Sequence, residues 1–105
     1  MTAVTLAGVD VELNEEGFLV DPTQWTEEMA VALARKEGID PLTEQHWQVI
    51  RFMRSEFLAK GTGPTVRMLG KTSGVPIKEL YQLFPGGPAK VAARIAGIPK
   101  PKGCI

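Results

Sequence analysis

The stretch EQHWQVIRFMRSEFLAK, residues 44–60, decides the fold of this chain. Large apolar side chains recur in it at the three- and four-residue spacing that lines one face of an α-helix. They are Trp47, Ile50, Met53 (with Arg54 as the alternative) and Phe57. We expect this helix to start at Thr43, to run to Gly61 and to be the central helix of the fold.

Four shorter helices are predicted on either side of it. The first of them is predicted in TEEMAVALARKEG, with Thr26 as a candidate N-cap and Gly38 as the residue that ends the helix. Its inner face is expected to hold Met29, Ala30, Leu33 and Ala34. The other three helices are expected with Pro64 at the N1 position as far as Gly74, from Pro76 to the residue before Pro85, and from Pro88 to Gly97.

A small β element precedes the helices. Apolar and polar residues alternate in VTLAGVDVELNEEGFLVDP, with turns expected at Gly8 and at Glu16–Gly17. The sequence therefore predicts an α+β fold that is mostly α. A β element over about residues 3–20 and helices over about residues 26–96 form a single domain, residues 1–97.

The composition is that of an ordinary soluble domain. Among 105 residues, 44% are hydrophobic and 23% are charged, which excludes a disordered chain. No apolar run approaches the roughly 18 residues of a membrane span. MTAVTLAGVDVE has neither a basic start nor a long apolar segment, which argues against a secretory signal. We expect a cytoplasmic protein with no membrane association.

Charge divides the chain into two halves. Residues 1–50 hold ten acidic and two basic side chains, and residues 51–105 hold two acidic and ten basic ones. Such a division is typical of a surface that binds anions or acidic partners. It also arises when the two halves attract each other in the fold. Both interpretations remain open from the sequence.

Metal and cofactor sites are not indicated. His46 is the single histidine and has no cysteine at ligand spacing, so we expect a structural residue beside Trp47. Neither a P-loop nor a GxGxxG motif occurs. FPGGPAK is rich in glycine, but it follows a predicted helix, and we interpret it as a turn.

The pair of helices in VRMLGKTSGVPIKELYQLF resembles a helix-turn-helix. Gly70 would be the small residue of the first helix and Gly74–Val75 the turn, with Leu80 and Leu83 packing the second helix inward. A DNA-binding regulator is therefore an alternative function. The second helix offers few side chains that could read bases, namely Lys78 and Gln82 opposed by Glu79.

The last residues, IPKPKGCI, form a predicted mobile arm, residues 98–105. Two prolines and a glycine are unsuited to regular structure, and the arm carries the only cysteine, Cys104. An exposed thiol without a neighbouring base or a second cysteine is poorly suited to catalysis by itself. It suits a carrier that holds sulfur as a persulfide. Its partner-binding residues would be Pro99, Lys100, Pro101, Lys102 and Gly103.

Residues along nearly the whole chain resemble the DsrC/TusE family, which contains the gamma subunit of dissimilatory sulfite reductase and sulfur-relay proteins. The segments are EGFLVDPTQW, EQHWQVIRFMR, VRMLGK, LYQLFP and, most specifically, PKPKGC. The resemblance implies a β-hairpin with a helical bundle and a C-terminal arm. It also implies that Cys104 accepts sulfane sulfur from a donor complex and passes it to an acceptor enzyme, without turnover of its own.

Two departures bear on the branch of the family. Two-cysteine members have another cysteine eleven residues upstream of the penultimate one, and Ala93 stands there in this chain. The segment from Lys71 to Leu80 is also shorter than in many members. The single cysteine resembles the TusE branch, which relays sulfur toward 2-thiouridine in tRNA. An accessory subunit of sulfite reductase is the alternative.

Overall fold

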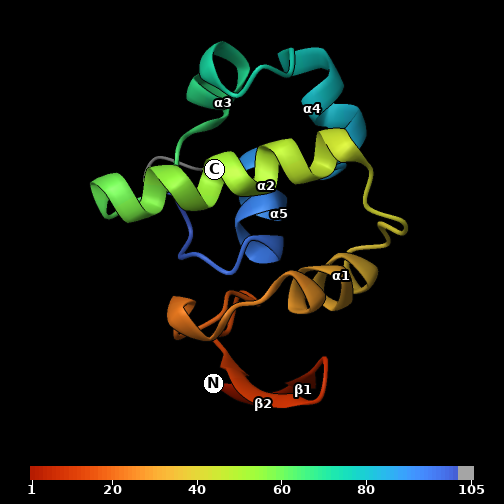
Figure 1. Ribbon diagram of the computed structural model, residues 1–105, viewed down its shortest axis with the longest axis vertical. Helices are drawn as coiled ribbons and strands as arrows, with labels where there is room; N and C mark the ends of the chain where they lie inside the picture. The colour runs from red at the N-terminus through yellow and green to blue at the C-terminus, as the bar shows by residue number, and fades with distance from the viewer. Residues whose placement is uncertain (102–105) are drawn as a thin grey trace.

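A computed structural model describes residues 1–101 of the chain (Figure 1). The N-terminal hairpin lies at one end of the molecule, and α3 and α4 lie at the other end. The elements in chain order are β1 (Thr2–Leu6), β2 (Val9–Leu13), the short 3-10 helix η1 (Pro22–Gln24), α1 (Glu27–Lys36), α2 (Glu44–Lys60), α3 (Val66–Thr72), α4 (Ile77–Leu83) and α5 (Pro88–Ile95). The fold is α+β and mostly α, as predicted.

The two strands form an antiparallel hairpin in which Leu6 pairs with Val9. Ala7 and Gly8 close it, both with positive φ, as the right-handed twist of a two-residue hairpin requires. A single bridge from Leu13 to Leu19 extends the pairing. One face of the hairpin is buried against α1, which joins the β element to the helical body.

Caps fix the ends of the first two helices. The Thr26 hydroxyl accepts a hydrogen bond from the N–H of Met29 at 3.2 Å, which confirms it as the N-cap of α1. Gly61 ends α2 in the left-handed conformation with φ of 77°. Such caps satisfy backbone groups that a helix leaves unpaired at its ends.

The inner face of α2 differs from the predicted one. Ile50 and Met53 are fully buried, whereas Trp47 and Phe57 are only partly buried. His46 occupies the inner face instead. Its Nδ1 accepts a hydrogen bond from the N–H of Thr43 at 3.0 Å, and its Nε2 donates to the carbonyl of Leu83 at 2.9 Å. Both ring nitrogens have hydrogen-bond partners, so burial of this polar ring leaves neither nitrogen unsatisfied.

Helix α5 lies at the centre of the bundle and contacts each of the other four helices (Figure 1). Its small residues allow this close packing, and Ala89, Ala92 and Ala93 are fully buried. Helices α3 and α4 contact each other, which confirms the helix-turn-helix-like pair. Pro64 lies outside α3, because the hydroxyl of Thr65 caps that helix. No helix of the described residues is long and apolar enough to span a membrane.

Candidate functional site

The described part of the C-terminal arm begins at the end of α5, beside Trp25. Gly97 has φ of 66°, a left-handed conformation that side chains disfavour. A Cβ at this position would overlap Cδ1 of the Trp25 indole. The indole Nε1 also donates a hydrogen bond to the carbonyl of Ile95 at 2.8 Å. Trp25 therefore fixes the direction in which the chain leaves α5.

Arg54 of α2 holds the same turn from the other side. Its Nη1 donates to the carbonyl of Ala96 at 2.8 Å, and its Nη2 donates to the carbonyl of Pro22 at 3.2 Å. The guanidinium lies 4.3 Å from the centre of the Trp25 ring, within cation–π range. Partial burial lowers the pKa of Arg54 from its ordinary value. These contacts attach the root of the arm to α2 and η1.

Part of the arm packs against the body rather than standing free. The Ile98 side chain is fully buried in the main core, and its N–H donates to the carbonyl of Ala93 at 3.2 Å. Pro101 is buried as well. A Cβ added to Gly63 would lie 2.7 Å from Cδ1 of Ile98 and 3.4 Å from Cγ of Pro101. Ile98 and Pro101 can approach the backbone of residue 63 this closely because glycine has no side chain.

An ion pair connects the arm to the turn after the hairpin. Lys100 Nζ lies 3.2 Å from Oε2 of Glu16, and Lys90 Nζ lies 3.9 Å from the same oxygen. Arg94 Nε donates to the backbone carbonyl of Glu16 at 2.8 Å. Lys100 is therefore a cation that the fold already pairs with an acid, while Pro99 is exposed. The pairing of acidic first-half and basic second-half residues favours attraction between the two halves.

The remaining predicted site residues are Lys102, Gly103 and Cys104, and they lie outside the described residues. The structure does describe Ala93, the position of the second cysteine in two-cysteine relatives. Ala93 is fully buried in α5, directly beneath the start of the arm. Among the described residues, no group of three or more histidines, aspartates and glutamates could hold a metal ion.

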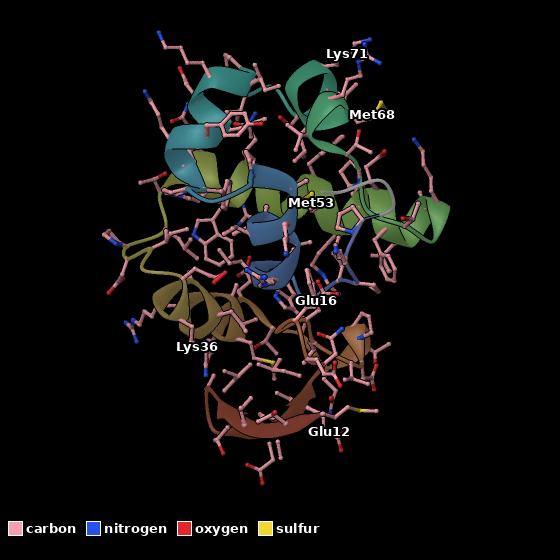
Figure 2. The ribbon with its side chains drawn as sticks, turned by 180° about the vertical axis from the view of Figure 1, so that it is seen from behind. Glu12, Glu16, Lys36, Met53, Met68 and Lys71 are labelled. Carbon is pink, nitrogen blue, oxygen red and sulfur yellow. The ribbon has the colours of Figure 1, made fainter. Side chains whose placement is uncertain are left out.

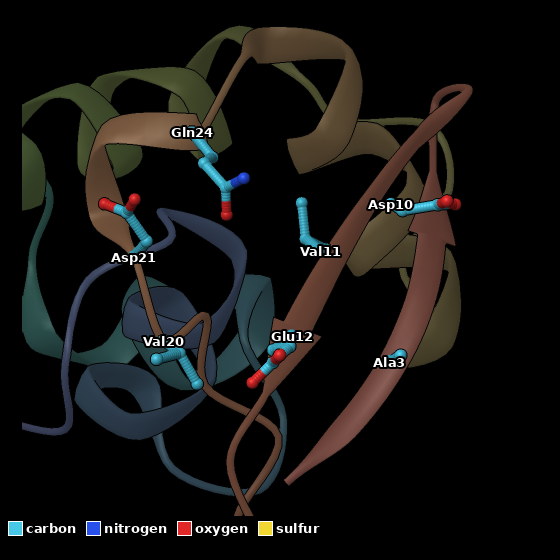
Figure 3. A pocket seen from close by; sticks show the side chains of 7 residues that line it. All are labelled: Ala3, Asp10, Val11, Glu12, Val20, Asp21 and Gln24. Atoms are coloured by element: carbon cyan, nitrogen blue, oxygen red, sulfur yellow. The ribbon is translucent and has the colours of Figure 1, made fainter.

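A separate cavity of about 410 Å³ lies between the hairpin and η1. Asp10, Glu12 and Asp21 are the acidic residues of its lining (Figure 3). The Thr23 hydroxyl donates to Asp21 at 2.6 Å and the Thr23 N–H donates at 3.0 Å, and these bonds lower the pKa of Asp21. Residues 98–101, the described part of the arm, do not line this cavity.

Trp25, Arg54 and Glu16 were missed by sequence reasoning. Trp25 was considered only as part of the segment EGFLVDPTQW, and Arg54 only as the alternative to Met53 on the inner face of its helix. Their contacts join residues 42 and 70 positions apart, which no local pattern reveals.

The fold and the arm match one family along almost the entire chain. The model of the family described as DsrC like protein matches residues 5–105, and the chain belongs to this family. The matching curated relatives include a protein named sulfurtransferase TusE in Salmonella typhimurium, 46% identical, and another of that name in Escherichia coli K12, 45% identical. Each comparison covers 93% of this chain and 95% of the relative.

Solved structures show the same fold. The oxidised gamma subunit of dissimilatory sulfite reductase, DsrC, from Archaeoglobus fulgidus is 41% identical with a TM-score of 0.82. DsrC from Allochromatium vinosum, solved by NMR, is 37% identical with a TM-score of 0.82. Both comparisons cover 99% of this chain and 100% of the other. The family resemblance predicted from PKPKGC and the other segments is confirmed.

Proposed function

We propose that this protein is a sulfur carrier whose carrying atom is the Sγ of Cys104. The Cys104 thiolate attacks the outer sulfur of a donor persulfide, forms a new S–S bond and releases the donor thiolate. An acceptor enzyme then takes the outer sulfur, and the Cys104 thiolate is regenerated. No net oxidant is needed, because the transferred sulfur keeps its oxidation state. Nearby cations raise the thiolate fraction of a cysteine, and Lys100 and Lys102 are its closest cations in sequence.

The main support is that the match to the family extends to residue 105 and so includes Cys104, the only cysteine. The anchored root of the arm is consistent with this role. Trp25 and Arg54 fix where the arm leaves the body, which lowers the entropy lost when the arm enters a partner. Pro99, which is exposed, and Gly103 would contact that partner in the cytoplasm, and Pro101 would do so after leaving its place beside Gly63.

The TusE branch, and with it sulfur relay toward tRNA thiolation, is favoured over the accessory role with sulfite reductase. Two-cysteine chemistry requires a second thiol within the same chain. Ala93 provides none, and Cys104 has no other cysteine to pair with in the same chain. An intramolecular bond between two cysteine sulfurs is therefore impossible in the wild-type chain.

The test is to incubate the full chain with glutathione persulfide and to measure its mass. We expect the wild type to gain one sulfur atom and to lose it again on treatment with a thiol. Cys104→Ser should gain none, because a hydroxyl cannot hold a persulfide, and its circular dichroism spectrum should match that of the wild type. Equal sulfur gain by Cys104→Ser, or none by the wild type, would overturn the proposal.

A further inference from the structure

Three large apolar side chains of α3 and α4 are exposed. Met68, Ile77 and Tyr81 are 36%, 48% and 54% exposed. A groove of about 670 Å³ lies between the two helices. Its lining residues are Val66, Arg67, Gly70, Lys71, Pro76 and Ile77. We call this groove and the three exposed residues the α3–α4 surface.

The α3–α4 surface is held in place from below. A Cβ at Gly70 would lie 3.2 Å from Cβ of Ile77, so glycine lets the two helices approach closely. Leu69 and Leu80 are fully buried beneath them. Gln48 of α2 donates to the carbonyl of Ser73 at 2.8 Å and fixes the turn. A surface supported in this way is formed before a partner arrives.

Cations belong to the same two helices: Arg67 and Lys71 line the groove, and Lys78 follows Ile77 in α4. Arg67, Lys71 and Lys78 form no ion pair or hydrogen bond with any residue that the structure describes. Six other basic residues do have a carboxylate within 4.0 Å: Arg35, Arg51, Lys60, Lys90, Arg94 and Lys100. The one acid between residues 66 and 83 is Glu79, which accepts a hydrogen bond from Gln45 at 2.7 Å. The surface therefore combines exposed apolar side chains with cations that have no acidic partner among the described residues.

The described end of the arm lies close to the start of α3. Pro101 is packed beside Gly63, and α3 begins three residues later, at Val66. A protein docked on the α3–α4 surface would thus lie near the place from which residues 102–105 continue. One partner could therefore bind the α3–α4 surface and also receive the arm.

We propose that the α3–α4 surface is the docking site for a partner protein that presents an amphipathic segment with acidic side chains beside apolar ones. The apolar residues would enter the groove, and the carboxylates would meet Arg67, Lys71 and Lys78. An apolar core with a charged rim is the usual anatomy of a protein interface. The connection of this partner to sulfur transfer rests on the carrier function proposed above.

The same surface is less suited to DNA. In a helix-turn-helix, α4 would enter the major groove, where polar side chains read base edges. The exposed residues of α4 include Ile77 and Tyr81, and the half-buried Glu79 carries a negative charge, which phosphates repel. DNA binding by this pair remains a competing outcome of the experiment.

The experiment titrates the ¹⁵N-labelled full chain with a synthetic helical peptide that has leucines on one face and glutamates beside them. We expect chemical-shift changes concentrated in residues 66–83. Arg67→Glu combined with Lys71→Glu should weaken binding at least about tenfold, because like charges then face each other. The neutral double variant Arg67→Gln and Lys71→Gln should weaken peptide binding less. It replaces the charge-reversal variant in the test if that variant does not fold.

The matched control is Lys36→Glu, a charge reversal of another lysine that has no ion pair among residues 1–101. Figure 2 shows Lys36 on α1, far from Lys71 and Met68. This variant should bind the peptide as the wild type does, and a peptide with lysines in place of glutamates should not bind. No binding of the acidic peptide, shifts outside residues 66–83, equal weakening by Lys36→Glu, or tighter binding of a DNA duplex at the same salt would overturn the proposal. Sulfur loading from glutathione persulfide does not involve this surface, so the two proposals fail separately.

Discussion

The indole of Trp25 fills the space in which a side chain at residue 97 would have to lie. The ring packs against Gly97, and its Nε1 donates to the carbonyl of Ile95 two residues earlier. Gly97 also has a positive φ of 66°. Two independent constraints, one steric and one conformational, therefore require glycine at the start of the arm.

Gly97→Ala should be strongly destabilising. The left-handed conformation costs an alanine about 1–2 kcal/mol, and displacing the indole adds about 1–3 kcal/mol. Gly8→Ala is a matched control, because Gly8 has φ of 81° but no atom near its added Cβ. Urea unfolding measures both free energies, and we expect the larger loss for Gly97→Ala. Equal losses would show that the indole moves away at no cost.

Arg54→Met should lower the free energy of unfolding by about 1–3 kcal/mol, because two carbonyls lose a charged donor. Arg51→Met is the control on the same helix. Arg51 is exposed, with an ion pair to Glu27 at 3.1 Å, and exposed pairs contribute about 0–1 kcal/mol. Both values come from the same urea titration. A loss for Arg51→Met as large as that for Arg54→Met would contradict the assigned role of Arg54.

Two truncations locate the end of the packed domain. A chain that ends at Gly97 loses Ile98, whose side chain is fully buried, and should be destabilised by about 2–5 kcal/mol. A chain that ends at Pro101 keeps this contact and should melt at the wild-type temperature. Thermal unfolding followed by circular dichroism compares them. If the chain that ends at Gly97 has the same melting temperature as the wild type, the domain ends at residue 97, as the sequence predicted.

The pKa of Asp21 should lie below the ordinary value of 3.8, because the Thr23 hydroxyl and then its N–H bind the carboxylate. Thr23→Val should raise that pKa, which a ¹³C NMR titration of the carboxyl group measures. A lowered pKa in the folded state means that the carboxylate stabilises the fold above pH 3.8, and this contribution is lost as the pH falls through the lowered pKa. An unchanged pKa in Thr23→Val would assign the shift to another cause.

Ala93→Cys should give the chain the intramolecular chemistry that the wild type lacks. With diamide as oxidant, we expect a monomeric disulfide between residues 93 and 104, while the wild type forms only linked dimers. The added sulfur enters a fully buried position and should cost about 1–3 kcal/mol. Mass spectrometry after digestion identifies the linked peptides. If Ala93→Cys forms only linked dimers, the difference between the one-cysteine and two-cysteine branches of the family involves more than residue 93.

Local signals in the sequence predicted the helices and the hairpin well. Thr26 is an N-cap, and Gly38 and Gly61 follow their helices, because caps depend on groups only a few residues apart. The register of α2 was less predictable. Hydrophobicity alone favoured Trp47 over His46, whereas the buried position belongs to the histidine, since Leu83 supplies an acceptor 37 residues away.

The candidate site was predictable only in part. The sequence motif PKPKGC led to the family that the comparisons confirm. The packing of Ile98 and Pro101 was not predicted, because prolines and lysines suggested a segment with nothing to bury. That packing depends on Gly63, a loop residue with no pattern to mark it. Sequence reveals the chemistry of the arm, and tertiary contacts reveal where the arm is held.

Trp25 packs against both hydrophobic clusters of the molecule, the helical core and the smaller cluster between the hairpin and α1. The hairpin cannot detach from the body without changing the surroundings of this ring. Fluorescence emission from Trp25, measured in a Trp47→Phe background, would therefore report loosening at either end of the molecule. Because Gly97 rests on the same ring, that signal would also register any rearrangement at the base of the arm during delivery of its cargo.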